Sequence, residues 1–353
     1  MDVQNLLKAG AATVRIGVGL LVIVASPSVT AFLAWFAISA VLELLAFAVV
    51  THRVIPALGF RPYFSLAAIR SVWRFSLTMA VIAILSMLIT QLDRLFVSKL
   101  LTLSDLGYYT LAYTAGVGIS LLQMSINTAS LPAFAEAAAL RPEALAERYS
   151  KVSEVMAYAI ALPSAVLVFF GSDILRVWIS ADGARAAGAA LMLISAGCFL
   201  NAVVSSAYIA SVATRRAGIP AIVNAIAILV YVPALYLLIS GYGIVGAAAC
   251  WMLLNIFYLC SLLPAVHRQV VHAPLASWLW RCLAVPALLA IAVFMPLKSA
   301  SASLSNEAAT WIALAMAVAI YAVGGYLLMS PGLRTELSKS GFLALIALRK
   351  RAA

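Results

Sequence analysis

The stretch "TQLDRLFVSKLLTLSDLGYYTLAY", residues 90–113, places an acid and a base side by side near the end of a long hydrophobic run. Asp93 and Arg94 are followed by a short apolar segment, a Gly-Tyr-Tyr sequence and a second hydrophobic run. Ionisable side chains inside such a run are costly in a bilayer unless they are paired or face water. What this stretch forms therefore depends on the solvent around the two runs.

The composition of the chain is that of a membrane protein. Of its 353 residues, 65% are hydrophobic and only 10% are charged, whereas soluble domains carry roughly 25% charged residues. The apolar residues form ten blocks, each near the length of about 20 residues that a helix needs to cross a bilayer. These blocks are residues 8–26, 29–50, 75–101, 105–131, 152–171, 187–210, 217–239, 243–265, 277–297 and 308–329. The sequence predicts an all-α integral membrane protein, a polytopic bundle of about ten transmembrane helices.

The basic residues predict how these helices are oriented. With the N-terminus in the cytoplasm, 17 of the 23 Lys and Arg residues fall on the cytoplasmic side, 5 fall on the outer side, and Arg15 lies within the first span. This asymmetry follows the positive-inside rule and predicts that both termini are cytoplasmic. Because the cations gather at span ends on one side, they indicate contact with anionic lipid rather than with nucleic acid.

Polar side chains form one face of the third span. At 100° per residue, six of them fall within an arc of roughly 160°. They are Ser86, Thr90, Gln91, Asp93, Arg94 and Ser98. For the hydroxyl groups, hydrogen bonding between helices is the favoured interpretation. For Arg94 we expect a water-filled interior, because a cation beside a single carboxylate still has donors to satisfy. Asp93 is expected to be a structural partner in an ion pair.

A second polar stripe runs along the whole fourth span, within about 100° of helix surface. It consists of Tyr109, Tyr113, Gly116, Ser120, Gln123, Asn127 and Ser130. A stripe that crosses the full depth of the bilayer exceeds what packing requires. We therefore expect it to form a wall of a polar cavity, with Tyr113, Gln123 and Asn127 among the substrate-binding residues.

The first two spans carry one ionisable residue each. Arg15 and Glu43 both lie roughly 10–12 Å from the inner end of their spans, at 1.5 Å per residue. An ion pair between them would relieve the desolvation cost of both. A structural pair and a ligand site that contains Arg15 are both open on this evidence.

No enzyme signature accompanies these groups. The sequence has no GxxxxGK[ST] or HExxH motif, and its four cysteines lie inside apolar blocks without metal-ligand spacing. We expect no enzymatic activity, no metal and no cofactor.

The opening stretch resembles the junction between spans seven and eight of bacterial polysaccharide transport proteins of the O-antigen flippase type. These belong to the multidrug/oligosaccharidyl-lipid/polysaccharide exporter superfamily. The matching residues are Asp93, Arg94, Leu106, Gly107 and Tyr109. Further similar segments are "LPAFAE" at 131–136, "YAIALPSAVLVFFGSDILRVW" at 158–178 and "LLISGYGIVGAAA" at 237–249.

The resemblance implies a partial two-lobe exporter fold, in which the ten spans correspond to the last ten of fourteen. Residues 1–56 would be two helices of the N-terminal lobe, 57–270 a six-helix C-terminal lobe, and 271–353 two additional helices with a basic cytoplasmic tail. The first four spans of such transporters would have no counterpart here.

The resemblance also implies a function. It is the flipping of a polyprenyl-pyrophosphate-linked oligosaccharide across the bacterial cytoplasmic membrane for polysaccharide or lipopolysaccharide biosynthesis, with polysaccharide polymerase or assembly proteins as further partners. Arg94, Arg15, Gln123 and Asn127 would line a hydrated, cationic cavity for the anionic head group.

Two alternatives remain open. A cation-coupled small-molecule antiporter of the same superfamily would need a membrane carboxylate, for which Asp93 and Glu43 are the candidates. A non-transporting component of an exopolysaccharide assembly system would fit a chain that lacks part of one lobe.

Overall fold

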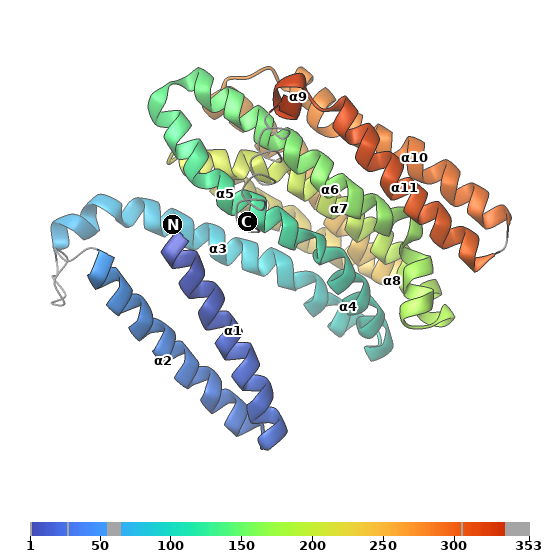
Figure 1. Cartoon of the computed structure of the whole chain (residues 1–353), viewed down its shortest axis with the longest axis horizontal. Coiled ribbons are helices and arrows are strands. Elements are labelled where there is room, and N and C mark those ends of the chain that lie inside the picture. Colours follow the sequence, from blue (N-terminus) through green and yellow to red (C-terminus); the bar gives the residue numbers. More distant parts are fainter. Residues whose placement is uncertain (1, 27, 55–64, 305, 336–353) are drawn as a thin grey trace, which may run out of the picture. The chain divides into compact units, whose positions relative to one another are not determined.

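The computed structural model describes residues 2–26, 28–54, 65–304 and 306–335, and most of these residues are helical. Figure 1 shows the path of these helices. The basic tail predicted after residue 335 lies outside the described residues. The elements, in chain order, are α1 (Asp2–Ala25), α2 (Val29–Val54), α3 (Leu66–Leu100), α4 (Leu103–Val117), α5 (Ile119–Leu140), α6 (Pro142–Trp178), α7 (Ala181–Ala213), α8 (Gly218–Val266), η2 (His267–Val271), α9 (Leu275–Leu279), η3 (Trp280–Ala284), α10 (Val285–Ser303) and α11 (Glu307–Leu328).

The predicted all-α membrane fold is confirmed. Within the described residues, seven helical segments are long and apolar enough to cross a membrane, and the one at Gly218–Val271 contains two of the ten predicted blocks. The block at 105–131 is divided at Gly118 into α4 and α5. The first block forms most of α1, whose apolar part covers Gly10–Ala25.

The two blocks inside α8 meet at Gly243. This residue has a φ of 59°, a left-handed conformation that costs glycine no steric penalty. At Gly246, an added Cβ would lie 1.9 Å from the carbonyl oxygen of Leu238. The chain therefore turns back on itself at the glycines of the segment "SGYGIVG", residues 240–246.

The chain divides into two compact units, Met1–Ser71 and Val72–Ala353. The first contains α1 and α2, which pack against each other. The second contains α4 to α11 and most of α3, so the helices after residue 270 belong to the same compact unit as those before it. The division into 1–56, 57–270 and 271–353 refers to lobes of a transporter and stays a prediction.

Helix α7 lies at the centre of the second unit, where it packs against α4, α5, α6 and α8. Small residues allow this close packing, as is usual between membrane helices. A Cβ on Gly116 of α4 would lie 2.5 Å from Ile194 of α7, and one on Gly197 of α7 would lie 2.6 Å from Trp251 of α8. Both glycines set the spacing of the helices around the polar interior.

Helices α10 and α11 lie side by side and pack on α6 (Figure 1). Lys298 of α10 forms an ion pair with Asp173 of α6. Near residue 270, the rings of Tyr149 and Trp278 stack at 5.9 Å between centroids. The buried His267 ring lies beside both and is 3.2 Å from the Tyr149 hydroxyl. These contacts hold the helices after residue 266 against α6 within the second unit.

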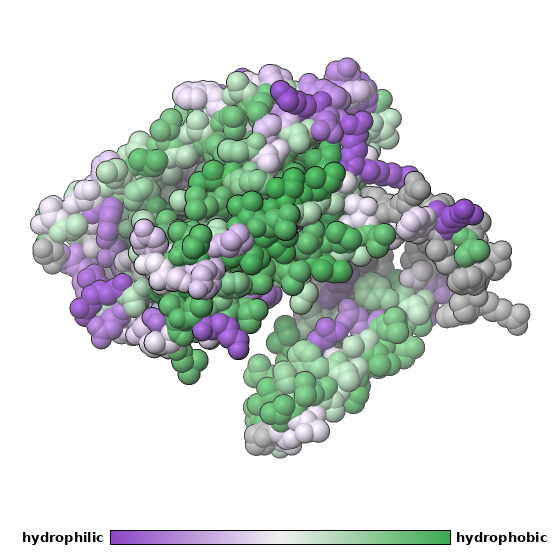
Figure 2. Space-filling view, turned by 180° about the vertical axis from the view of Figure 1, so that it is seen from behind, coloured by the Kyte–Doolittle hydropathy of each residue, from purple (hydrophilic) through white to green (hydrophobic). Residues whose placement is uncertain are grey.

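Hydrophobic side chains cover much of the visible face of the second unit, and hydrophilic ones gather toward its edges (Figure 2). Leu121 on α5 and Leu229 on α8 are 71% and 74% exposed. Apolar surface of this extent is unfavourable in water but is the natural surface of a bundle in lipid.

Candidate functional site

A cavity of about 420 Å³ opens between α3, α4, α5, α7 and α8 of the second unit. Its polar lining consists of hydroxyl, phenol, carboxamide and indole groups. The polar side chains are Ser86, Thr90, Tyr113, Ser120, Gln123, Asn127, Asn201, Ser205, Tyr208, Asn224, Trp251 and Tyr258. Among the described residues that line it, none is charged. The cavity lining is therefore neutral rather than cationic, with hydrogen-bonding groups set among apolar side chains.

Four of the seven residues in the stripe predicted on the fourth span line this cavity, whereas Tyr109, Gly116 and Ser130 do not. Tyr113 comes from α4, whereas Ser120, Gln123 and Asn127 come from α5. The break at Gly118 is small, because this residue keeps a right-handed helical conformation with φ −50° and ψ −32°. The face of the fourth span is thus continuous across the two helices.

Three carboxamides on three helices form a hydrogen-bonded chain beside the cavity. Gln123 Nε2 of α5 donates to Asn201 Oδ1 of α7 at 3.0 Å. Asn201 Nδ2 donates to Asn255 Oδ1 of α8 at 2.8 Å. Asn255 Nδ2 donates to the carbonyl oxygen of Trp251, one helical turn earlier, at 2.9 Å. This chain connects the cavity surface with the interior of the bundle.

Two further contacts connect polar residues across the cavity. The Ser205 hydroxyl of α7 lies 3.2 Å from Asn127 Oδ1 of α5. Asn224 Nδ2 of α8 lies 3.4 Å from the Ser86 hydroxyl of α3. The sequence prediction missed the polar cavity residues Asn201, Ser205, Tyr208, Asn224, Trp251 and Tyr258, and it also missed Asn255 as the buried partner of Asn201. The available signal was a lone carboxamide in each of three apolar spans, since polar groups in membrane helices usually have a partner.

The polar arc on α3 is only partly directed to the cavity. Ser86 and Thr90 line it, whereas Gln91 and Ser98 are exposed. Asp93 is 1% exposed, and its carboxylate accepts a 2.6 Å hydrogen bond from the Tyr109 hydroxyl of α4. Its neighbour in this contact is thus a neutral phenol, where an ion pair was expected.

Arg94 is not among the residues that line the cavity. Its guanidinium lies over the ring of Tyr113, 4.1 Å from the centroid, and Tyr113 does line the cavity. The charge is therefore placed behind an aromatic side chain, where it contributes a cation–π interaction.

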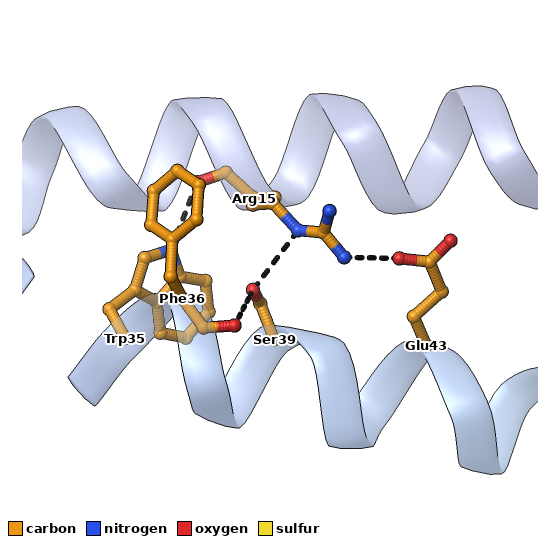
Figure 3. Close-up of polar contacts among 5 residues, drawn as sticks. All are labelled: Arg15, Trp35, Phe36, Ser39 and Glu43. Atoms are coloured by element: carbon orange, nitrogen blue, oxygen red, sulfur yellow. Dashed lines mark hydrogen bonds and ion pairs between the residues drawn. The ribbon is translucent and has the colours of Figure 1, made fainter. Parts of the chain in front are cut away.

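In the first unit, Arg15 and Glu43 form the ion pair that the sequence suggested (Figure 3). Arg15 Nε also donates to the Ser39 hydroxyl at 3.1 Å, and the Trp35 indole donates to the Arg15 carbonyl oxygen at 2.9 Å. All these groups lie between α1 and α2. The pair therefore has a structural role within its hairpin, and a role in substrate binding stays a prediction.

Helix α6 carries two carboxylates that sequence reasoning did not single out. Glu154 is 6% exposed and accepts a 2.6 Å hydrogen bond from the backbone N–H of Ser330. Asp173 is the partner of Lys298. Asp93 and Glu43 are therefore not the only carboxylates that have a partner elsewhere in the described part of the chain.

Comparison with known proteins places the chain among glycan-related membrane proteins. The sequence profile of a family described as "Polysaccharide biosynthesis protein" matches residues 2–180. A Shigella flexneri protein assigned as an O-antigen transporter is 20% identical over 279 residues, which are 79% of this chain and 62% of that protein.

Among solved structures, the inward closed conformation of the lipid II flippase MurJ is similar with a TM-score of 0.61 and 14% identity. The match covers 87% of this chain and 63% of the flippase. This similarity establishes a shared fold. The chain spans less than two thirds of the length of both relatives.

Proposed function

Because the chain belongs to the polysaccharide biosynthesis protein family, we propose that it takes part in flipping a lipid-linked oligosaccharide across the bacterial cytoplasmic membrane. The observation that carries this proposal is the neutral, hydrogen-bonding cavity inside an apolar bundle. A glycan in hydrocarbon would lose its hydrogen bonds to water, at a cost of several kcal/mol per polar group. The carboxamides and hydroxyls of the cavity would replace those hydrogen bonds.

In this proposal Gln123, Asn127 and Tyr113 contact the substrate directly, because they line the cavity. Arg94 lies over the Tyr113 ring and outside the cavity lining, so its charge would serve an anionic head group beside the cavity while the neutral sugars occupy the cavity itself. Arg15 is included as a residue of the first unit whose guanidinium has donors beyond those used by Glu43 and Ser39.

The transport cycle requires more than one lobe. Alternating access in such folds is a rocking of two halves around a site near the bilayer midplane. The whole activity is therefore proposed for the assembled transporter, with the polyprenyl-pyrophosphate-linked oligosaccharide as substrate and polymerase or assembly proteins as partners. The proposed orientation has both termini in the cytoplasm.

Photo-crosslinking tests the proposal without requiring completed transport. A photoreactive phenylalanine analogue is placed at Val117, which lines the cavity, and the matched control carries it at the exposed Leu121. In membranes supplied with radiolabelled lipid-linked oligosaccharide, the glycan should be captured at position 117 and not at 121. Equal capture at both positions, or capture of the lipid tail alone, would reject glycan passage through this cavity.

A further inference from the structure

The three-carboxamide chain has a direction that the protein itself determines. The two ends of an Asn or Gln carboxamide have nearly the same shape, so the orientation of the group follows from its hydrogen-bond partners. Here the chain ends on the carbonyl oxygen of Trp251, which can only accept. Asn255 must therefore present its NH₂ group to Trp251 and its oxygen to Asn201.

The orientation of Asn255 also determines the orientations of the two carboxamides nearer the cavity. Asn201 must donate its NH₂ group to Asn255, which leaves its oxygen for Gln123. Gln123 must then donate its own NH₂ group to Asn201. Asn255 is fully buried, with an exposed fraction of 0%, so water does not compete for this anchor.

Gln123 is consequently held with its carbonyl oxygen unused. Within the described part of the chain, Gln123 Oε1 has no hydrogen-bond partner, whereas its Nε2 is held by Asn201. Since Gln123 lines the cavity, its Oε1 keeps both lone pairs available to a ligand, and the second N–H of Nε2 is its only remaining donor. An acceptor pairs with a donor, such as a hydroxyl or an amide N–H, and not with a phosphate or carboxylate oxygen.

We infer that this cavity selects the uncharged, hydrogen-bond-donating sugars of the glycan through Gln123 Oε1, with Asn201 and Asn255 as positioning residues. This inference rests on the proposed function. The absence of charge among the described lining residues supports it, because a carboxylated sugar or a pyrophosphate would lose its hydration without meeting a cation. The rings of Tyr113, Tyr208 and Trp251 add apolar surface for the C–H faces of sugars.

Ligand binding to the full chain in lipid nanodiscs tests the inference by saturation-transfer NMR. The probes are chitotriose, which is neutral and carries hydroxyl and amide N–H donors, trigalacturonate of equal length, and inorganic pyrophosphate. Chitotriose should bind, and neither trigalacturonate nor pyrophosphate should displace it. Gln123→Leu should weaken chitotriose binding about three- to tenfold, the value of one hydrogen bond. Gln91→Leu makes the same change at an exposed position on α3 and should leave binding unchanged.

Asn255→Leu tests the positioning role, because it leaves Gln123 in place but removes its anchor. The released carboxamides can turn over, so the preference for chitotriose over trigalacturonate should fall, while the size-exclusion profile identifies the folded fraction that is measured. Asn201→Leu provides the same test if Asn255→Leu does not fold. A wild-type chain that binds no chitotriose, or that binds trigalacturonate or pyrophosphate equally well, overturns the inference.

The two proposals can fail separately. If photo-crosslinking shows no glycan at Val117 in membranes while the Gln123-dependent selectivity for chitotriose holds, the flippase function is rejected and the selectivity stands. If glycan is captured at Val117 and Gln123→Leu binds chitotriose like the wild type, the function stands and the selectivity is rejected.

Discussion

The hydroxyl of Tyr109 donates a 2.6 Å hydrogen bond to the carboxylate of Asp93, sixteen residues earlier in the chain. Both side chains are buried, at 0% and 1% exposure. The bond joins α3 to α4 across their short connection, which Thr102 and Asp105 cap with reciprocal hydrogen bonds. The acid of the opening stretch thus has a partner inside the protein.

Asp93→Ala should lower the yield of folded protein, because it leaves the buried Tyr109 hydroxyl without an acceptor. The cost should be about 1–3 kcal/mol, seen as a lower Tm in fluorescence-detected size-exclusion chromatography. Asp93→Asn keeps an oxygen for Tyr109 and should retain most of the stability. If Asp93→Ala melted like the wild type, the bond would have no structural role.

Arg94→Ala should leave the yield of folded protein nearly intact and reduce glycan export. Its guanidinium stacks on Tyr113, a contact worth about 0.5–1 kcal/mol at accessible sites, so its loss is tolerable for folding. Arg94→Lys should be partly active, because charge rather than planar geometry serves the anionic head group. The measurement is complementation of a flippase-deficient strain by the variant and by the unchanged protein. Wild-type export by Arg94→Ala would remove Arg94 from the proposed site.

Gly197→Ala should disturb the cavity by moving Trp251. The new methyl group would lie 2.6 Å from Trp251 Cδ1 and 3.3 Å from the backbone Cα of Met252, so α7 and α8 must separate. Overpacking of this kind costs about 1–3 kcal/mol. Gly218→Ala is the matched control, since nothing lies within 4 Å of its added Cβ. Thermal unfolding should therefore distinguish the two variants, and equal Tm values would contradict the close approach of α7 and α8.

Glu43→Ala should destabilise the α1–α2 hairpin more than the double change Arg15→Met, Glu43→Leu. The single change leaves the Arg15 guanidinium without its carboxylate, and an unpaired charge at membrane depth costs more than an apolar pair of similar size. Susceptibility of the hairpin to added protease in nanodiscs measures the difference. The ion pair would be dispensable if both variants were equally resistant.

A cysteine at position 61 should remain unlabelled by a membrane-impermeant thiol reagent in intact cells, in a chain whose native cysteines are replaced. The reason is the distribution of 17 Lys and Arg residues on one side against 5 on the other, which predicts that the connection at 51–74 is cytoplasmic. A cysteine at position 182, between the predicted spans at 152–171 and 187–210, should be labelled. The reverse pattern would invert the proposed topology.

Local sequence was sufficient for the helices and for the face of the fourth span. Apolar blocks of membrane length and the 3.6-residue period are properties of neighbouring residues. For this reason Tyr113, Gln123 and Asn127 could be placed on one surface before any tertiary contact was known, and a lone Arg15 and Glu43 in adjacent spans could be paired because a short connection places these helices side by side.

Only the tertiary structure decided the partners of the remaining polar groups. Asn201 and Asn255 lie on different helices and are far apart in the sequence. Helical periodicity relates only neighbouring residues, so it does not show which faces of two mostly apolar helices meet. The packing of glycines such as Gly197 decides this. The same packing turned Arg94 onto Tyr113 and left the described cavity lining without charge. The sequence by itself determined which residues are polar within the membrane; the three-dimensional packing decided which of them meet a ligand and which meet one another.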